Sequence, residues 1–250
     1  MMQYHEIAIP TRSEHLWRYT PWHRIHPSKV EEIPSSDMVK FSSGTDFELE
    51  GSSEIARAFI HEIAKSTKLV ELNNQHLEVD LRCSGHVCSG QLVVKSKGKS
   101  SLILRISGDA GWIGLRIVGN VTDNLSVAII NDLATDAHLL RCEDWNVGRD
   151  SELELSHLSA GAFLNKSDVR VNLTDTGACF RGGVASNGHG SRHDDNHVEI
   201  CHEVGHTNSS LTIHSACDGS SHSVGTGLLT INENANGSDA EQVFRNLLLS

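Results

Sequence analysis

Residues 91–130 read QLVVKSKGKSSLILRISGDAGWIGLRIVGNVTDNLSVAII. Four short runs in this stretch alternate apolar and polar residues, and Gly, Asn, Asp or Ser separates each run from the next. Alternation with a period of two is typical of β-strands, because successive side chains point to opposite faces. The stretch therefore predicts four consecutive short strands with turns between them.

The same pattern continues from Leu69 to the end of the chain. Further runs are AHLLRC, SELELS, DVRVNL, HVEIC, SLTIH and GLLTI. A sandwich, an antiparallel barrel or a stacked solenoid could hold such an array. The hairpin dipeptide Asn-Gly occurs only at Asn187-Gly188 and Asn236-Gly237, whereas an array of tight hairpins would favour it. We therefore expect an all-β chain built as a parallel β-helix over residues 69–250.

Residues 1–68 show a different pattern and predict a small helical region. In SSEIARAFIHEIAK the residues Ile55, Phe59 and Ile63 follow one another at intervals of four, with Ser53 as the expected N-cap. A second, short helix is expected from Ser13 to a point before Pro21. We expect this region to pack its tryptophans, Trp17 and Trp22, onto the main body.

The last fourteen residues, Gly237 to Ser250, read GSDAEQVFRNLLLS. In a β-helix every coil offers its strand edges to the neighbouring coil, so an end coil must be capped or paired. We expect the final coil to need a partner, with Leu247 to Leu249 outside any sealed core.

Composition excludes several classes of protein. The formal net charge of -11 argues against a general nucleic-acid binder, which needs a basic surface. No apolar run approaches the roughly 18 residues of a membrane span, and the first residues lack the order of a signal peptide. We therefore expect a cytoplasmic protein that binds neither nucleic acid nor membrane. Its six cysteines are too sparse for a disulfide scaffold.

Motifs for catalysis are missing from the sequence. It contains no Gly-x-Ser-x-Gly, no His-Glu-x-x-His and no Gly-x-Gly-x-x-Gly ahead of a helix. We therefore expect no enzyme and no catalytic residue. The alternative is a polysaccharide-active enzyme, because β-helices also host lyases and hydrolases.

Histidine and cysteine are concentrated in two places. CSGHVC brings Cys83, His86 and Cys88 close together, which indicates either a metal site or a turn with half-buried thiols. HGSRHDDNHVEICHEVGH (residues 189–206) is denser, and it suggests a metal site or a stand-alone metal-binding protein. Alternation on a strand would put His197 and Cys201 on one face and His202 on the other. The competing interpretation is that these side chains occupy turns or form ladders between coils.

Two segments resemble one known family. PTRSEHLWRYTP (Pro10 to Pro21) is similar to an N-terminal signature of SufD, and residues 193–250 align with the SufD core without an evident gap. Matching positions in this second segment are His193, Asp195, His202, His206, Gly227, Ala235, Asp239, Ala240, Gln242 and Asn246 to Ser250. The chain thus resembles the SufB/SufD components of the SUF machinery for iron–sulfur cluster assembly. Phe244 stands where SufB carries a cysteine, so the likeness is to SufD.

The resemblance implies a right-handed parallel β-helix after a small helical N-terminal region, acting as a non-catalytic scaffold. Its expected partner is a SufB-like protein, or a second copy of itself, through the late β-helix. The family also binds a SufC-type ATPase through a C-terminal helical domain, which we expect this chain to lack, so that SufC binding cannot be carried over.

A transient iron–sulfur cluster is the cofactor that the resemblance implies. The candidate metal ligands are His193, Asp195, His197, Cys201, His202 and His206. In the family the histidine and aspartate positions have a second possible role, which is to stabilise a turn by hydrogen bonds to the backbone.

Overall fold

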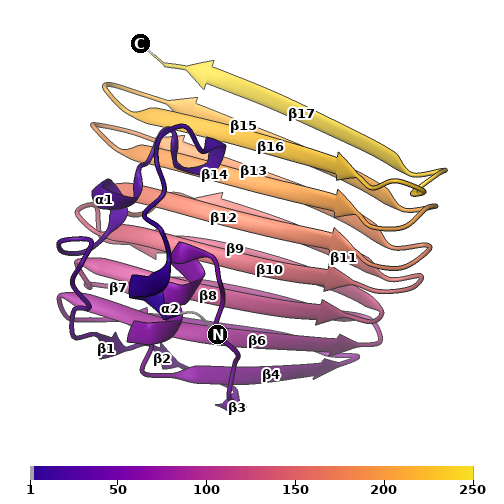
Figure 1. Cartoon of the computed structure of the whole chain (residues 1–250), viewed down its shortest axis with the longest axis horizontal. Coiled ribbons are helices and arrows are strands. Elements are labelled where there is room, and N and C mark those ends of the chain that lie inside the picture. Colours follow the sequence, from indigo (N-terminus) through magenta and orange to yellow (C-terminus); the bar gives the residue numbers. More distant parts are fainter. Residues whose placement is uncertain (1–2, 250) are drawn as a thin grey trace.

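The computed structural model describes residues 3–249 and shows a parallel β-solenoid whose coils stack along one axis (Figure 1). Each coil contributes one strand to each of two sheets, so the even-numbered strands from β4 to β16 share one sheet and the odd-numbered strands from β5 to β17 share the other. All pairings among these strands are parallel. This arrangement confirms the predicted fold class.

The N-terminal region is short and mixed. It contains the 3-10 turns η1 (Tyr4–Glu6) and η2 (His15–Trp17), the helices α1 (Trp22–Ile25) and α2 (Ile55–Ile63), and the strands β1 (Asp37–Met38), β2 (Lys40–Phe41) and β3 (Thr45–Asp46). The solenoid consists of β4 (Thr67–Asn73), β5 (His76–Cys83), β6 (Val87–Lys97), β7 (Ser100–Gly108), β8 (Trp112–Val121), β9 (Asn124–Leu133), β10 (His138–Val147), β11 (Glu152–Ser159), β12 (Leu164–Leu173), β13 (Cys179–Gly188), β14 (His193–His202), β15 (Asn208–Cys217), β16 (His222–Ile231) and β17 (Asp239–Leu248).

The interior of the solenoid is a continuous column of aliphatic side chains, to which every strand from β4 to β15 contributes. Leu104 and Ile129, for example, have no exposed surface, and burying such a side chain stabilises the fold by about 1.5–3 kcal/mol. The coils near the C-terminal end are longer than those near the cap end: the matched side chains His76 and Ser101 are 25 residues apart, whereas Ser215 and Asn246 are 31 residues apart.

The two ends of the solenoid differ. At the first end, short antiparallel strands close both sheets, since β3 pairs with β4 and β2 pairs with β5. At the other end, β16 and β17 are the outermost strands of their sheets, and no strand within residues 3–249 pairs with their outer edges. We refer to β16 and β17 as the end coil.

Residues 3–66, which we call the cap, contain the two strands that close the first end, and their helices lie across the outer face of the even-numbered strands (Figure 1). Trp17 and Trp22 pack edge to face at 5.3 Å inside an apolar cluster that includes Phe59 of α2 and Trp112 of β8. The predicted packing of both tryptophans is therefore confirmed. None of the helices in residues 3–249 is long and apolar enough to cross a membrane.

Two details of the helix predictions are wrong. The short helix expected from Ser13 is the 3-10 helix η2, which ends before Pro21 as expected but begins only at His15, and α1 follows Pro21. The N-cap of α2 is Glu54, whose N–H donates to Ser52 Oγ, so Ser53 does not cap the helix. Both errors are of one or two residues, which is the usual uncertainty in the position of a helix end.

The predicted alternating runs lie in strands, but the solenoid strands β4, β5, β13 and β17 were not among them. In β13 the paired glycines Gly182 and Gly183 remove the apolar signal, and β17 is mostly exposed. Both strands form because each completes a ladder with the preceding strand of its sheet, β11 and β15 respectively.

Candidate functional site

The predicted ligands lie on or just after β14, and its alternation divides them between two faces. Asp195 and His197 point outward beneath the cap, where they contact Lys166 and Asp168 of β12. His202 points into the solenoid, where it bonds two hydroxyl groups. The predicted separation of His197 from His202 is therefore confirmed.

His193 begins β14 under the cap. Its Nε2 lies 3.1 Å from the hydroxyl oxygen of the fully buried Thr20, and its ring centre lies 6.4 Å from that of His222 on the next coil. Burial lowers the pKa of His193, and Arg24 lowers it further, while Asp195 acts in the opposite direction. The side chain is thus held in the neutral form and joins the cap to β14.

Asp195 is paired with Lys166, whose ammonium nitrogen lies 2.9 Å from the carboxylate. This ammonium also donates to the carbonyl oxygen of Leu16 at 2.7 Å and lies 5.7 Å from the centre of the Trp17 ring. A fully buried lysine is stable only when its charge is paired in this way. Asp195 therefore neutralises an ammonium group that holds the cap.

His197 belongs to a chain of buried charges. Its Nδ1 lies 3.1 Å from Asp168, and Asp168 in turn pairs with Arg57 of α2. Arg57 Nε also donates to Asp144 at 2.8 Å. We call Arg57, Asp144, Asp168 and His197 the ion-pair belt. It joins α2 to three successive strands of one sheet.

The belt keeps Asp168 in its ionised form. Burial by itself would raise the pKa of Asp168, but Arg57, His197 and Arg170 hold this pKa well below its usual range. Asp168 is therefore ionised and accepts hydrogen bonds only. In their contact His197 Nδ1 must then be the donor and Asp168 the acceptor.

The three remaining candidates lie at the C-terminal end of β14 or in the turn that follows it. Cys201 contacts Asn232 at 3.8 Å, at the far end of β14. His202 is fully buried, with its ring nitrogens 2.7 Å from Thr207 Oγ1 and 2.8 Å from Ser209 Oγ. His206 sits in the following turn with a φ of 58°, in the left-handed region. The backbone there bonds to the neighbouring coils.

The six candidates do not form one coordination sphere. In residues 3–249 no three His, Cys, Asp or Glu side chains are grouped so that they could hold a metal ion. His193, Asp195, His197 and His202 each contact another protein side chain. The metal role of these residues stays a prediction.

Sequence reasoning missed Arg57, Asp144 and Asp168. Arg57 lies two positions from both Ile55 and Phe59, which would place it on a solvated side of the helix, yet α2 is buried on nearly every side. The carboxylates belong to neighbouring coils, and only the register between strands brings them to Arg57. The only signal in the sequence was that the charged residues Asp144 and Asp168 stand within or next to predicted strands, where a charge that turns out to be buried needs a partner.

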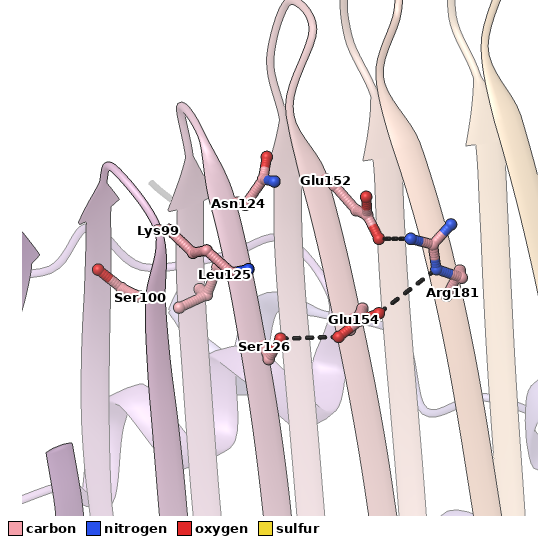
Figure 2. Close-up of a pocket in the computed structure, with 8 residues that line it drawn as sticks. All are labelled: Lys99, Ser100, Asn124, Leu125, Ser126, Glu152, Glu154 and Arg181. Atoms are coloured by element: carbon pink, nitrogen blue, oxygen red, sulfur yellow. Dashed lines mark hydrogen bonds and ion pairs between the residues drawn. The ribbon is translucent and has the colours of Figure 1, made fainter. Parts of the chain in front are cut away.

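A small hollow of about 190 Å³ lies on the outer face of the odd-numbered strands. Figure 2 shows Arg181 reaching toward Glu152 and Glu154, while Ser126 Oγ donates to Glu154 at 2.7 Å. One guanidinium thus joins two carboxylates of the preceding coil. These contacts link successive coils on the solvated face.

The surface at the end coil is apolar, unlike the charged hollow on the odd-numbered strands. Val184, Ile213 and Phe244 follow one another in register on successive strands. Val184 is 5% exposed and Ile213 is 2% exposed, but Phe244 is 43% exposed. Other exposed apolar side chains of this region are Leu228, Ile231, Leu247, Leu248 and Leu249. More than half of the large apolar side chains exposed in residues 3–249 therefore lie at this end.

A family model described as "SUF system FeS cluster assembly, SufBD core domain" matches residues 115–250, which run from β8 to the end coil. No curated protein is similar enough to the chain to count as a relative.

Proposed function

Because the chain belongs to the SufBD family of the SUF system for iron–sulfur cluster assembly, we propose that it is a SufD-like scaffold. In this proposal its end coil pairs with a SufB-like subunit. The observation that carries the proposal is the exposure of an apolar row and two strand edges at one end of an otherwise closed solenoid.

The apolar row supports pairing in a specific way. Phe244 occupies the position that Ile213 fills one coil earlier, and a next coil or a partner would bury it as Ile213 is buried. Leu248 is 81% exposed. Contiguous apolar surface of this kind marks interaction sites in soluble proteins.

The strand edges supply the second part of the argument. The outer edges of β16 and β17 carry backbone N–H and C=O groups that no strand within residues 3–249 bonds. Free edges readily accept strands from another chain. A subunit with a similar solenoid could extend both sheets at once, which would bury apolar side chains and pair backbone groups together.

The test is co-purification with the SufB-like protein of the same source. Wild-type protein should form a complex that migrates as one species in gel filtration, and the double variant Leu247→Glu/Leu248→Glu should not. Leu158→Glu is the matched control, since Leu158 is also an exposed leucine of a strand but lies on β11. Folded wild-type protein that forms no complex, or equal effects of both variants, would contradict the proposal.

The proposed role is non-catalytic, and the iron–sulfur cluster is cargo that the assembly holds transiently. The proposed place of action is the cytoplasm. Anaerobic reconstitution of the complex with iron and sulfide should give a visible cluster spectrum. Tight binding of colourless zinc without such a spectrum would favour a stand-alone metal-binding protein.

A further inference from the structure

The dipeptide Asn236-Gly237 lies in the turn that joins β16 to β17 in the end coil (Figure 1). Both residues are exposed. The chain has one other Asn-Gly pair, Asn187-Gly188, which lies at the end of β13. There Gly188 is buried and pairs with Cys217 of β15. The same two residue types therefore stand in an open turn at one place and in a strand ladder at the other.

Two groups of the exposed turn lack a hydrogen-bond partner within residues 3–249, namely the Asn236 carboxamide and the Gly237 N–H. The peptide carbonyl between them, by contrast, accepts a hydrogen bond from the His206 N–H at 3.0 Å. This bond draws electrons toward the carbonyl oxygen and so makes the N–H of the same peptide group more acidic. The Gly237 nitrogen is therefore both unpaired and activated.

Packing requires glycine at position 237. Its φ of +75° lies in the left-handed region, which other residues rarely adopt. A Cβ there would also lie 2.7 Å from Nδ1 of the His206 ring. Because glycine has no side chain, its nitrogen is the least shielded from the residue before it. The fold thus keeps, directly after Asn236, the residue that best lets a backbone nitrogen reach the carboxamide.

We propose that Asn236 is a site of spontaneous deamidation and isomerisation, and that this modification loosens β17. The exposed carboxamide, the unpaired Gly237 nitrogen and the hydrogen bond from His206 to the carbonyl between them carry the proposal. It does not rest on pairing with a SufB-like subunit, because the reaction needs only the folded chain and water.

The reaction consumes one water and releases one ammonia. The Gly237 nitrogen gives up its proton and attacks Cγ of Asn236, and the carboxamide nitrogen takes up a proton and leaves as ammonia, which closes a succinimide ring. Water then opens the ring at either of its carbonyls. Opening at Cγ gives aspartate, and opening at the backbone carbonyl gives isoaspartate, in which the chain runs through Cβ and Cγ. Each product carries a new carboxylate.

The modification acts on the last strand of the odd-numbered sheet. Within residues 3–249 β17 pairs only with β15, and at its start the Asp239 N–H donates to the carbonyl oxygen of Thr207 at 2.9 Å. Isoaspartate lengthens the backbone shortly before this bond. Because the length of a turn sets the register of the strand that follows it, the longer turn displaces β17 from β15.

The experiment incubates the folded full chain in mildly alkaline buffer and follows both Asn-Gly sites by peptide mapping. Cleavage after Glu233 and Glu241 gives NANGSDAE, and cleavage after Arg181 and Arg192 gives GGVASNGHGSR. We expect the first peptide to gain the mass of an amide-to-acid exchange and to split into aspartate and isoaspartate forms. It should do so at least about tenfold faster than the second, because Gly188 reacts only when its ladder opens. In urea both sites should react at similar rates.

Asn236→Gln is the matched variant, because glutamine keeps the amide but would have to close a larger, less favourable ring. After incubation, wild-type protein should exchange the amide hydrogens of β17 faster than fresh protein does. The variant should keep the slower exchange, and β11 should be unchanged in both proteins.

Two results would overturn parts of the proposal separately. Equal rates at Asn236 and Asn187 in the folded chain, or modification at Asn234 in place of Asn236, would overturn the assignment of the site. Modification of Asn236 with unchanged hydrogen exchange in β17 would overturn its effect on the strand.

Discussion

Arg57 and Asp168 are 111 residues apart in the sequence, yet they form an ion pair in which each side chain is 3% exposed. Arg57 comes from α2 in the cap, and Asp168 comes from β12 in the solenoid. The same guanidinium also contacts Asp144 on the preceding coil. The cap is therefore held by charge as well as by its aromatic cluster.

Replacing Arg57 tests the strength of this attachment. Arg57→Ala would leave the buried Asp168 carboxylate without its main partner, and breaking a buried pair in this way costs about 3–5 kcal/mol. Arg149→Ala is the matched control, because its pair with Asp175 is largely exposed and should contribute less than about 1 kcal/mol. Urea unfolding of both variants should show this difference, and equal losses would show that the belt does not hold the cap.

A second buried cluster predicts acid sensitivity. Glu143 lies inside the solenoid, 2.8 Å from Arg141 and 3.1 Å from His157. Burial would raise its pKa, but His157 and Arg141 lower it to about 2. A lowered pKa of an acid stabilises the folded state above the unfolded pKa, and this stabilisation is lost as the pH falls toward 2.

The lowering of the Glu143 pKa corresponds to roughly 3 kcal/mol of folding stability at neutral pH. Glu143→Gln should therefore flatten the decline in unfolding free energy between about pH 5 and pH 2. Glu241→Gln, at an exposed position of β17, should leave the decline unchanged. The measurement is chemical unfolding at a series of pH values, and an unaltered slope in Glu143→Gln would contradict the assignment.

The space around the α-carbon predicts opposite results for two glycines, one facing the solenoid interior and one facing outward. The indole of Trp145 covers Gly119, and a Cβ there would lie 2.0 Å from Trp145 Cε3. Gly119→Ala should therefore destabilise the protein by about 1–3 kcal/mol through overpacking. At Gly183 the nearest atom to an added Cβ is 4.0 Å away. Gly183→Ala should raise the melting temperature slightly or leave it unchanged, as a thermal scan of both variants would reveal.

His202 should behave as a structural residue with a pH signature. Burial lowers its pKa, so the unfolded chain takes up a proton near pH 6.5 while the native state resists it. Stability should fall as the pH drops below about 6.5, and His202→Asn should reduce that fall. The same variant should lose about 1–3 kcal/mol at neutral pH, because the hydroxyls of Thr207 and Ser209 lose a partner.

The exposed His214 provides the comparison for His202. His214→Asn should alter neither the stability at neutral pH nor its dependence on pH. If His202→Asn instead left stability unchanged and abolished binding of iron or zinc, the hydrogen-bonded role would be wrong and a ligand role would replace it.

The sequence alone determined the strand array and its closure into a solenoid. Runs such as SLILRI and LSVAII specify which residues face the core, since alternation is a local property of an extended backbone. The shortage of hairpin turns and the likeness to SufD then selected the parallel β-helix. The helix around Phe59 and the packing of Trp17 and Trp22 were also predictable, because apolar spacing marks a buried face.

Tertiary structure decided which polar groups meet. The contacts of Arg57 with Asp168 and of Lys166 with Asp195 depend on the register of coils about 26–29 residues long and on where the cap lies across them. Cys83 and Cys88 likewise both face the core only because the corner between β5 and β6 turns them inward. Local sequence fixes the face of a strand that a side chain occupies, whereas its partner across the ladder is fixed by the length of every intervening turn.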